Sequence, residues 1–242
     1  MQSSLTAALA AVFTTVALAA PQQKPTPKPP LPVKDQAPPR PPTKATTTHA
    51  DADKPVQGTG QMPAGWKVRF DKPDAKPETV KVIAEKDALE FETGPAGIYY
   101  RTDMKAEKDY EVGASFSQLD PAELPEEFGL IIGGVDLDKP TQQYTCFLVR
   151  QDAKFSIQKR SGATTKTAVA WRPVPAMKEP KGVKTTHTLI IRAHGNNVRF
   201  FIGDKEVAKL TRAQVGGDGL AGLRINHNLH LQVSKFEVKK AQ

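Results

Sequence analysis

The sequence has few of the residues that build redox, zinc or membrane sites. It contains one cysteine among 242 residues, so it cannot form an internal disulfide. Its five histidines lack the spacing of zinc ligands. Its apolar run at residues 5–19 is shorter than the roughly 20 residues that span a membrane. We therefore expect no disulfide framework, no zinc site and no integral membrane span.

The short apolar run is typical of a secretion signal. Residues 17–19 read Ala-Leu-Ala, the small-x-small pattern that signal peptidases recognise. We predict that residues 1–19 form a signal peptide and that the protein is secreted or periplasmic. No lysine or arginine precedes the run, and the alternatives are an uncleaved anchor or a mis-assigned start codon.

Prolines and aromatic residues divide the rest of the chain. Twelve of the 21 prolines lie in residues 21–63, which contain no aromatic residue. Such a segment buries too little apolar surface to fold, and its prolines and positive charges favour an extended chain. We predict a disordered Pro/Lys-rich linker over residues 20–63 and one folded domain over residues 64–242. The linker is expected to act as a spacer, with docking of its Pro-Lys pairs on a partner as the alternative.

The pattern of the domain predicts an all-β fold. From Trp66 onward, apolar and polar residues alternate in short runs bounded by glycine, proline, asparagine and aspartate, as in sandwiches and barrels. Only residues 122–127 and 211–215 are candidates for helices. Strands are expected at residues 66–70, 79–83, 89–91, 97–101, 110–116, 128–132, 144–150, 155–159, 165–169, 188–194, 198–202, 219–225 and 229–238.

One hairpin can be tested for internal consistency. A two-residue turn at residues 195–196 pairs only apolar residues on one face and places Arg192 opposite Arg199 on the other. Like charges that face each other are unfavourable unless something neutralises them. A nearby acid such as Glu206 or Glu237 would do so, and the alternative is an anionic ligand. A second turn is expected at residues 203–204.

These hairpins also carry a resemblance to a known family. Residues 188–207 resemble the strand–turn–strand–turn signature of concanavalin A-like jelly rolls, and residues 219–224 and 231–238 resemble their closing strands. Residues 88–90, 97–102 and 109–112 are similar to their opening strands. Within this class the chain is most similar to laminin G-like folds and to bacterial 3-keto-disaccharide hydrolase domains. The resemblance implies a two-sheet antiparallel jelly-roll sandwich.

The resemblance also implies a function in carbohydrate recognition. We predict a secreted, non-catalytic module that binds a carbohydrate or an anionic cell-envelope polymer through a flexible tether. A glycoside hydrolase of the 3-keto-disaccharide type and a structural protein-interaction sandwich are the alternatives. The hydrolase relatives carry an acidic residue where this chain has Thr145, and no catalytic residue is predicted. Residues 85–90 match the E-x-D-x-x-E pattern of laminarinase-type glycosidases, but a turn at residues 86–87 would direct its acids along different strands.

Aromatic and arginine side chains are the groups that we expect to hold a sugar. Tyr99 and Arg101 share one face of a predicted strand, and Tyr144 and Arg150 share another, because side chains two residues apart do so. Trp171 opens a Pro-rich loop, where an indole can stack on a sugar ring. The predicted ligand-binding residues are Tyr99, Arg101, Tyr144, Arg150, Trp171, Arg192 and Arg199.

The net charge of the domain bears on whether it binds nucleic acid. Residues 1–63 carry six basic and three acidic residues, which leaves about +5 of the net +8 charge on the domain. That bias is mild, and no recognition helix or aromatic-rich RNA motif is present, so we expect no nucleic-acid partner.

Asp136 and Asp138 suit Ca²⁺ as loop carboxylates, and the alternative is that both are solvated. No other cofactor is expected. Cys146 is expected to be a small buried apolar side chain, and the protein a monomer.

Overall fold

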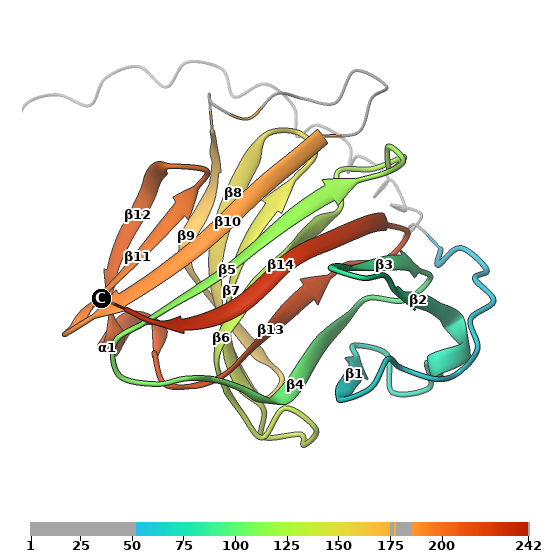
Figure 1. Ribbon diagram of the computed structural model, residues 1–242, viewed down its shortest axis with the longest axis horizontal. Coiled ribbons are helices and arrows are strands. Elements are labelled where there is room, and N and C mark those ends of the chain that lie inside the picture. Colours follow the sequence, from blue (N-terminus) through green and yellow to red (C-terminus); the bar gives the residue numbers. More distant parts are fainter. Residues whose placement is uncertain (1–51, 175–176, 178–184, 242) are drawn as a thin grey trace, which may run out of the picture. The chain divides into compact units, whose positions relative to one another are not determined.

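A computed structural model describes residues 52–174, 177 and 185–241 of the chain. The predicted signal peptide, and the predicted linker up to residue 51, lie outside these residues. The described chain forms two antiparallel sheets packed face to face, which confirms the predicted all-β sandwich (Figure 1). No helix among the described residues is long and apolar enough to cross a membrane.

Each sheet contains seven strands. Neighbouring strands of the first sheet, called sheet A, are β1 (Trp66–Phe70), β4 (Gly97–Ala106), β13 (Gly219–Ile225), β6 (Glu127–Val135), β7 (Gln143–Arg150), β8 (Lys154–Ser161) and β9 (Thr164–Pro173). Those of sheet B are β12 (Lys205–Thr211), β11 (Asn197–Ile202), β10 (Thr185–His194), β5 (Tyr110–Gln118), β14 (His230–Lys240), β3 (Ala88–Thr93) and β2 (Val80–Ala84). Because sequence neighbours often lie in different sheets, residues far apart in the chain meet on one sheet face.

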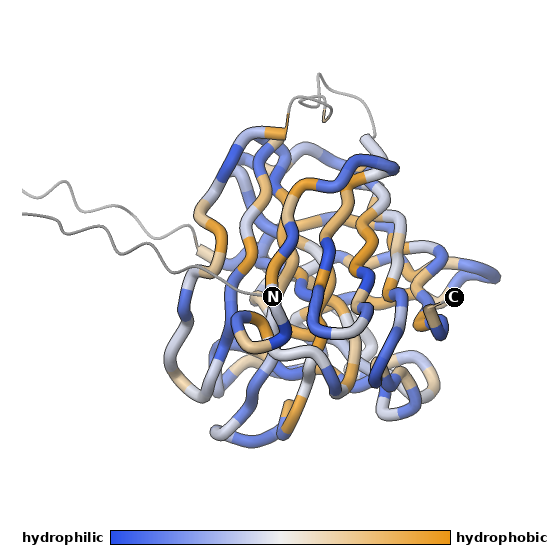
Figure 2. Tube along the Cα trace, turned by 90° about the vertical axis from the view of Figure 1, so that its left-hand side faces the viewer, coloured by the Kyte–Doolittle hydropathy of each residue, from blue (hydrophilic) through white to orange (hydrophobic). Residues whose placement is uncertain are grey.

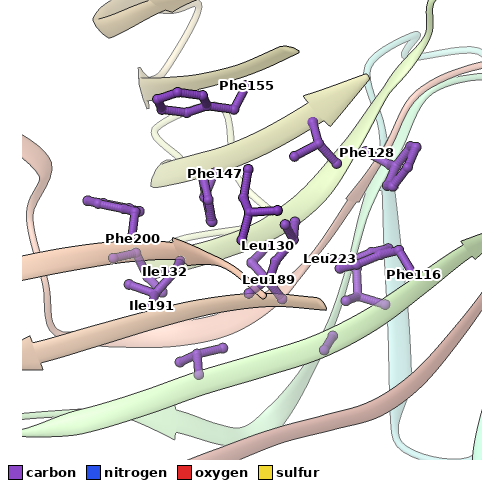
Figure 3. Packing of buried hydrophobic residues seen from close by; sticks show 14 of the residues in the cluster. Phe116, Phe128, Leu130, Ile132, Phe147, Phe155, Leu189, Ile191, Phe200 and Leu223 are labelled. Carbon is purple, nitrogen blue, oxygen red and sulfur yellow. The ribbon is translucent and has the colours of Figure 1, made fainter. Parts of the chain in front are cut away.

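The core lies between the two sheets because alternate residues of each strand point inward. Apolar residues concentrate along the strands, whereas many of the connecting loops are hydrophilic (Figure 2). Phe147 of sheet A packs edge-on against Phe200 of sheet B, with ring centroids 5.3 Å apart, and so joins the two sheets (Figure 3). Burying one such side chain contributes about 1.5–3 kcal/mol.

The predicted hairpin register is confirmed. In the pairing of β10 with β11, Ile191 lies opposite Phe200 and Arg192 lies opposite Arg199. The turns that flank β11 begin at Gly195 (φ 54°) and Gly203 (φ 62°). Both glycines adopt left-handed backbone conformations that other residues seldom tolerate.

One of the two predicted helices forms and the other does not. α1 (Arg212–Val215) follows Thr211, whose side chain forms a capping box with Gln214. Residues 122–126 contain no helix, and β6 begins at Glu127. Proline at position 125 disfavours a helical conformation for Leu124. A second helical segment, the short 3-10 helix η1 (Pro77–Thr79), precedes β2.

Residues 52–58, predicted as part of the linker, lie against the folded domain. The Lys54 amide donates to Asn228 Oδ1 (2.7 Å), and Asn228 Nδ2 donates to the Ala52 carbonyl (3.0 Å). The Gly58 amide donates to the Glu78 carbonyl (2.8 Å). A Cβ at position 58 would lie 1.8 Å from the Val80 carbonyl oxygen, so the contact requires glycine. The ordered domain therefore begins before residue 64.

Candidate binding site on the outer face of sheet A

A pocket of about 190 Å³ lies on the outer face of sheet A. Three of its lining residues, Tyr144, Cys146 and Leu148, belong to a small apolar cluster that is separate from the core between the sheets. We call it the outer-face pocket. It is lined by Asp71, Glu127, Tyr144, Cys146, Leu148, Gln158, Arg160, Thr165 and Arg224.

Strand alternation and register bring the central residues of this pocket together. Tyr144, Cys146 and Leu148 are alternate residues of β7 and therefore share one face. The neighbouring strand β8 places Gln158 opposite Cys146 and Arg160 opposite Tyr144. An apolar and aromatic floor thus lies beside an amide and a guanidinium.

Two glycines leave part of the outer face without side chains. A Cβ on Gly129 in β6 would lie 1.9 Å from the Phe147 carbonyl oxygen, and one on Gly222 in β13 would lie 2.5 Å from the Tyr99 carbonyl oxygen. Neither position can hold a larger residue without moving the backbone. Gly129 is also the register partner of both Arg224 and Leu148, so bare backbone separates these two pocket side chains.

A bidentate ion pair forms one side of the pocket. Arg224 Nη1 and Nη2 donate to the two carboxylate oxygens of Asp71 at 2.8 and 2.6 Å. The Arg224 side chain is 10% exposed and that of Asp71 is 51% exposed. Burial by itself lowers the pKa of Arg224, but the hydrogen bonds and the charge of Asp71 together raise that pKa above its ordinary value. Arg224 therefore remains charged within the sheet face.

Glu127 supplies a second carboxyl group with different surroundings. Burial raises the pKa of Glu127, and the positive charges of Arg224 and Arg150 offset this only in part. Among the described residues, none is hydrogen-bonded or ion-paired to its side-chain carboxyl group. The carboxyl group therefore lies in the pocket with its hydrogen-bonding capacity available to a ligand.

Arg160 lies at the β8–β9 side of the pocket. Its Nε donates to the Gly162 carbonyl at 2.6 Å, and its Nη1 donates to Thr165 Oγ1 at 3.2 Å. Gln158 Nε2 donates to Ser156 Oγ at 3.3 Å. These contacts hold both side chains in place and leave further donors of each free of protein partners within the described chain.

Trp171 and Arg150 flank the pocket. The Arg150 guanidinium lies 4.3 Å from the centre of the Trp171 ring and bonds both carboxylate oxygens of Asp152 at 3.0 and 2.7 Å. Trp171 packs, partly buried, against the apolar cluster that contains Tyr144 and Leu148. Arg150 also faces Glu127 across the β6–β7 pairing.

Tyr144, Trp171 and Arg150 are the sequence-predicted residues that the structure brings together at this face. Tyr99 is different: its side chain is 0% exposed and packs against Phe91 in the core, so it cannot be the predicted ligand platform. Arg101 lies outside the pocket lining and bonds Asp103 at 2.9 and 2.6 Å. Its predicted partnership with Tyr99 at a ligand is therefore wrong.

The remaining sequence-predicted arginines lie on sheet B, and each has its own acid. Arg192 Nε donates to Glu111 (2.6 Å), and Arg199 Nε donates to Glu206 (2.7 Å). The prediction that a nearby acid such as Glu206 neutralises the facing arginines is therefore confirmed. Glu237, the other acid suggested for this role, pairs with Lys239. The two arginines therefore require no anionic ligand.

The loop carboxylates and the cysteine show no sign of metal or nucleophile chemistry. Asp136 accepts hydrogen bonds from Lys139 Nζ (2.8 Å) and Thr141 Oγ1 (3.1 Å). Within the described ranges, Asp136 and Asp138 belong to no group of three or more acidic, histidine or cysteine side chains that could hold an ion. Cys146 is buried as predicted, and burial raises the pKa of its thiol to about 12, which keeps it protonated at neutral pH.

Sequence reasoning missed Asp71, Glu127, Gln158, Arg160 and Arg224. One signal was present: Arg224 is a charged residue within an otherwise apolar predicted strand, a position that normally requires a buried partner. That partner is Asp71, which lies 153 residues away in the sequence. The E-x-D-x-x-E motif, by contrast, is split by a turn, as predicted, and Glu85 and Glu90 bond different residues of β14.

The comparison with solved structures identifies the fold. No protein-family model matches the chain, and no curated protein matches it in sequence. Among solved structures, carbohydrate-binding module CBM66 from Bacillus subtilis has a TM-score of 0.54 at 11% identity and covers 77% of this chain and 100% of its own. A protein of unknown function with a galectin-like fold from the same organism has a TM-score of 0.53 at 11% identity, covering 72% and 89%. The fold is a concanavalin A-like jelly roll, as predicted.

Proposed function

We propose that this protein is an exported, non-catalytic module that binds a saccharide in the outer-face pocket. The observation that carries the proposal is the convergence, on one sheet face, of hydrogen-bonding side chains that have unused donors or acceptors. Glu127, Gln158 and Arg160 have such capacity, and they adjoin an apolar floor formed by Tyr144 and Leu148. A sugar ring presents hydroxyl groups at its edge and C–H groups on its face, so it needs both kinds of surface.

The pocket is prepared for a ligand before it binds. Arg224 is fixed by Asp71, and Arg160 by Gly162 and Thr165. Side chains already held in place lose little conformational entropy when a ligand binds. At about 190 Å³, the pocket is below the size of drug-like sites, and a group the size of one monosaccharide suits it.

The fold and the sequence support the same assignment. One solved structure with this fold is named as a carbohydrate-binding module. The predicted signal peptide would direct export of such a module, and the predicted Pro/Lys-rich linker would hold it away from a cell surface. Because the described domain begins near residue 52, the proposed tether is residues 20–51 rather than the whole of residues 20–63.

A second function, cleavage of the bound saccharide, is favoured by one observation. Burial raises the pKa of Glu127, which is the property of a general acid in glycoside hydrolysis. Retaining hydrolysis also needs a second carboxylate about 5–5.5 Å away. The other pocket carboxylate, Asp71, is engaged at both oxygens by Arg224. This occupation favours binding over cleavage.

A glycan array probed with the full chain tests the proposed function. We expect binding to a subset of glycans, which Gln158→Ala weakens and Arg192→Ala, on sheet B, does not. The bound glycans are then incubated with the protein and analysed for reducing ends. If new reducing ends form and Glu127→Gln abolishes them, the protein is a hydrolase and the non-catalytic proposal is wrong. Binding that Gln158→Ala leaves intact would remove the outer-face pocket as the site.

A further inference from the structure

We infer that the saccharide is acidic and that Arg160 binds its anionic group, a carboxylate or a sulfate on the ring that occupies the outer-face pocket. This inference rests on the proposed function. Arg224 and Arg160 line the pocket and Arg150 lies beside it, and they differ in whether a carboxylate pairs with the guanidinium.

Two of these arginines already have a carboxylate partner. Asp71 bonds Arg224 through both oxygens, and Asp152 bonds Arg150 in the same way. For Arg160, the partners in the described chain are both neutral, the Gly162 carbonyl and the Thr165 hydroxyl. Arg160 is thus the one pocket arginine whose charge is not paired within the described residues.

Glu127 does not supply the missing charge. Among the described residues, its carboxyl group forms no hydrogen bond or ion pair with Arg160, and its register partner across β6 and β7 is Arg150. Burial is the largest effect on this carboxyl group and disfavours its ionised form. The charge of Arg160, on the β8–β9 side of the pocket, therefore has only neutral partners among the described residues.

The Arg160 side chain has unused donors that suit an oxyanion. Its Nε and one hydrogen of Nη1 are used to anchor it to the β8–β9 hairpin, and a guanidinium carries five N–H donors in all. The hydrogens of Nη2 and the second hydrogen of Nη1 remain for a ligand. A planar pair of donors matches the two oxygens of a carboxylate or a sulfate.

The position of Arg160 also defines where the anionic group lies in a bound sugar. Tyr144 is its register partner on β7, and Thr165 is its partner on β9. Gln158 lies two residues along the same strand and lines the same pocket. The acidic substituent would bond Arg160 while ring hydroxyls reach Gln158 and the Glu127 carboxyl group.

The test compares acidic saccharides with neutral counterparts of the same backbone. Oligogalacturonate and its carboxyl-reduced form separate the carboxylate, and dextran sulfate and dextran separate the sulfate. The full chain is titrated with each by calorimetry at 0.15 M salt. We expect at least one acidic member to bind about 10- to 100-fold more tightly than its neutral counterpart, the range of a charge-assisted hydrogen-bonded pair.

Variants assign that difference to Arg160. Arg160→Gln is expected to reduce the acidic saccharide to the affinity of the neutral one, and Arg160→Lys to restore only part of the preference. Arg192→Gln makes the same change in net charge on sheet B and is expected to retain the full preference. Loss of the preference in Arg192→Gln as well would indicate general attraction to a basic protein and overturn the inference.

The remaining outcomes separate the inference from the proposed function. Equal affinity for acidic and neutral members, with both weakened by Gln158→Ala, would overturn the acidic ligand and keep the outer-face pocket as a saccharide site. A preference for the acidic member that survives Arg160→Gln would also overturn it. Absence of binding to all four saccharides and to every glycan of the array would overturn both proposals.

Discussion

Asp71 and Arg224 form a bidentate ion pair across the face of sheet A, although 153 residues separate them in the sequence. Asp71 follows the edge strand β1, and Arg224 lies in β13, in the interior of the sheet. The pair ties the segment after β1 to the sheet interior and fixes one side of the outer-face pocket. The stability of the fold and the geometry of the pocket therefore both depend on this ion pair.

Asp71→Ala is expected to destabilise the fold by about 2 kcal/mol, because it leaves the 10%-exposed Arg224 side chain without its carboxylate. The exposure of Asp71 itself keeps this cost below that of a fully buried pair. Urea unfolding of the purified chain measures the change. Asp103→Ala removes an exposed bidentate partner of Arg101 and is the matched control, expected to change the urea midpoint much less. Equal costs for the two variants would contradict the role assigned to the buried arginine.

Glu127→Gln is expected to stabilise the protein at neutral pH. Burial raises the pKa of Glu127 in the folded state, so folding favours its protonated form. The wild type thus loses stability as pH rises from the unfolded-state pKa of about 4.5 through the higher folded-state pKa. The variant has no charge to bury. Urea midpoints of the two proteins should converge at pH 4 and separate by pH 7, and a variant less stable at pH 7 would show that the carboxylate is stabilised in the fold.

His230 gives a pH dependence at a second position, on sheet B. Its ring nitrogens lie 2.6 Å from Asp120 and 3.0 Å from Glu90. Although burial acts to lower the pKa of His230, the hydrogen bonds to Asp120 and Glu90 outweigh it and raise that pKa above 6.5. Its stabilising contribution is full below pH 6.5 and disappears as pH rises through the higher folded-state pKa. Thermal unfolding of His230→Asn should show a smaller loss of stability between pH 6 and pH 8 than the wild type does. An unchanged pH profile would contradict this assignment.

Gly129→Ala is expected to destabilise the protein severely, by more than about 3 kcal/mol. Its Cβ would lie 1.9 Å from the Phe147 carbonyl oxygen, which belongs to backbone in the middle of sheet A. Gly113→Ala is a matched control in a central strand of sheet B, where the nearest atom is at an ordinary contact distance of 3.8 Å. Circular dichroism melting curves should show a near-native Gly113→Ala and a strongly destabilised or unfolded Gly129→Ala. Similar melting temperatures would mean that β6 can shift to admit a side chain.

The sequence predicts the strands and local hairpins well because period-two alternation and turn glycines act over a few residues. The register that places Arg192 opposite Arg199 needs only the turn at Gly195, and it is confirmed. The face that each strand buries is a different matter. In β4, Ile98 and Tyr100 alternate with Tyr99, so both faces are apolar, and the outer face has its own buried cluster. Alternation alone therefore could not show that Tyr99 points into the core.

The pocket is harder to predict than the fold because it depends on pairing between distant strands. Glu127, Gln158 and Arg224 lie on β6, β8 and β13, and only the strand order of sheet A brings them together. Tyr144 is predicted from the strand face that it shares with Arg150, and Trp171 from its place before a Pro-rich segment, and both signals are local in the sequence. Trp171 lies in β9, which extends to Pro173, and not in the predicted loop. A carboxyl group such as that of Glu127 gives no such signal until its burial is known.

The most direct test of the central claim is a crystal structure of the protein with the glycan that binds most strongly in the array. We predict a sugar ring in the outer-face pocket, in hydrogen-bonding contact with Gln158 and Glu127, with its acidic group on Arg160. A sugar bound on the outer face of sheet B, near Arg192 and Arg199, would contradict the assignment of the site.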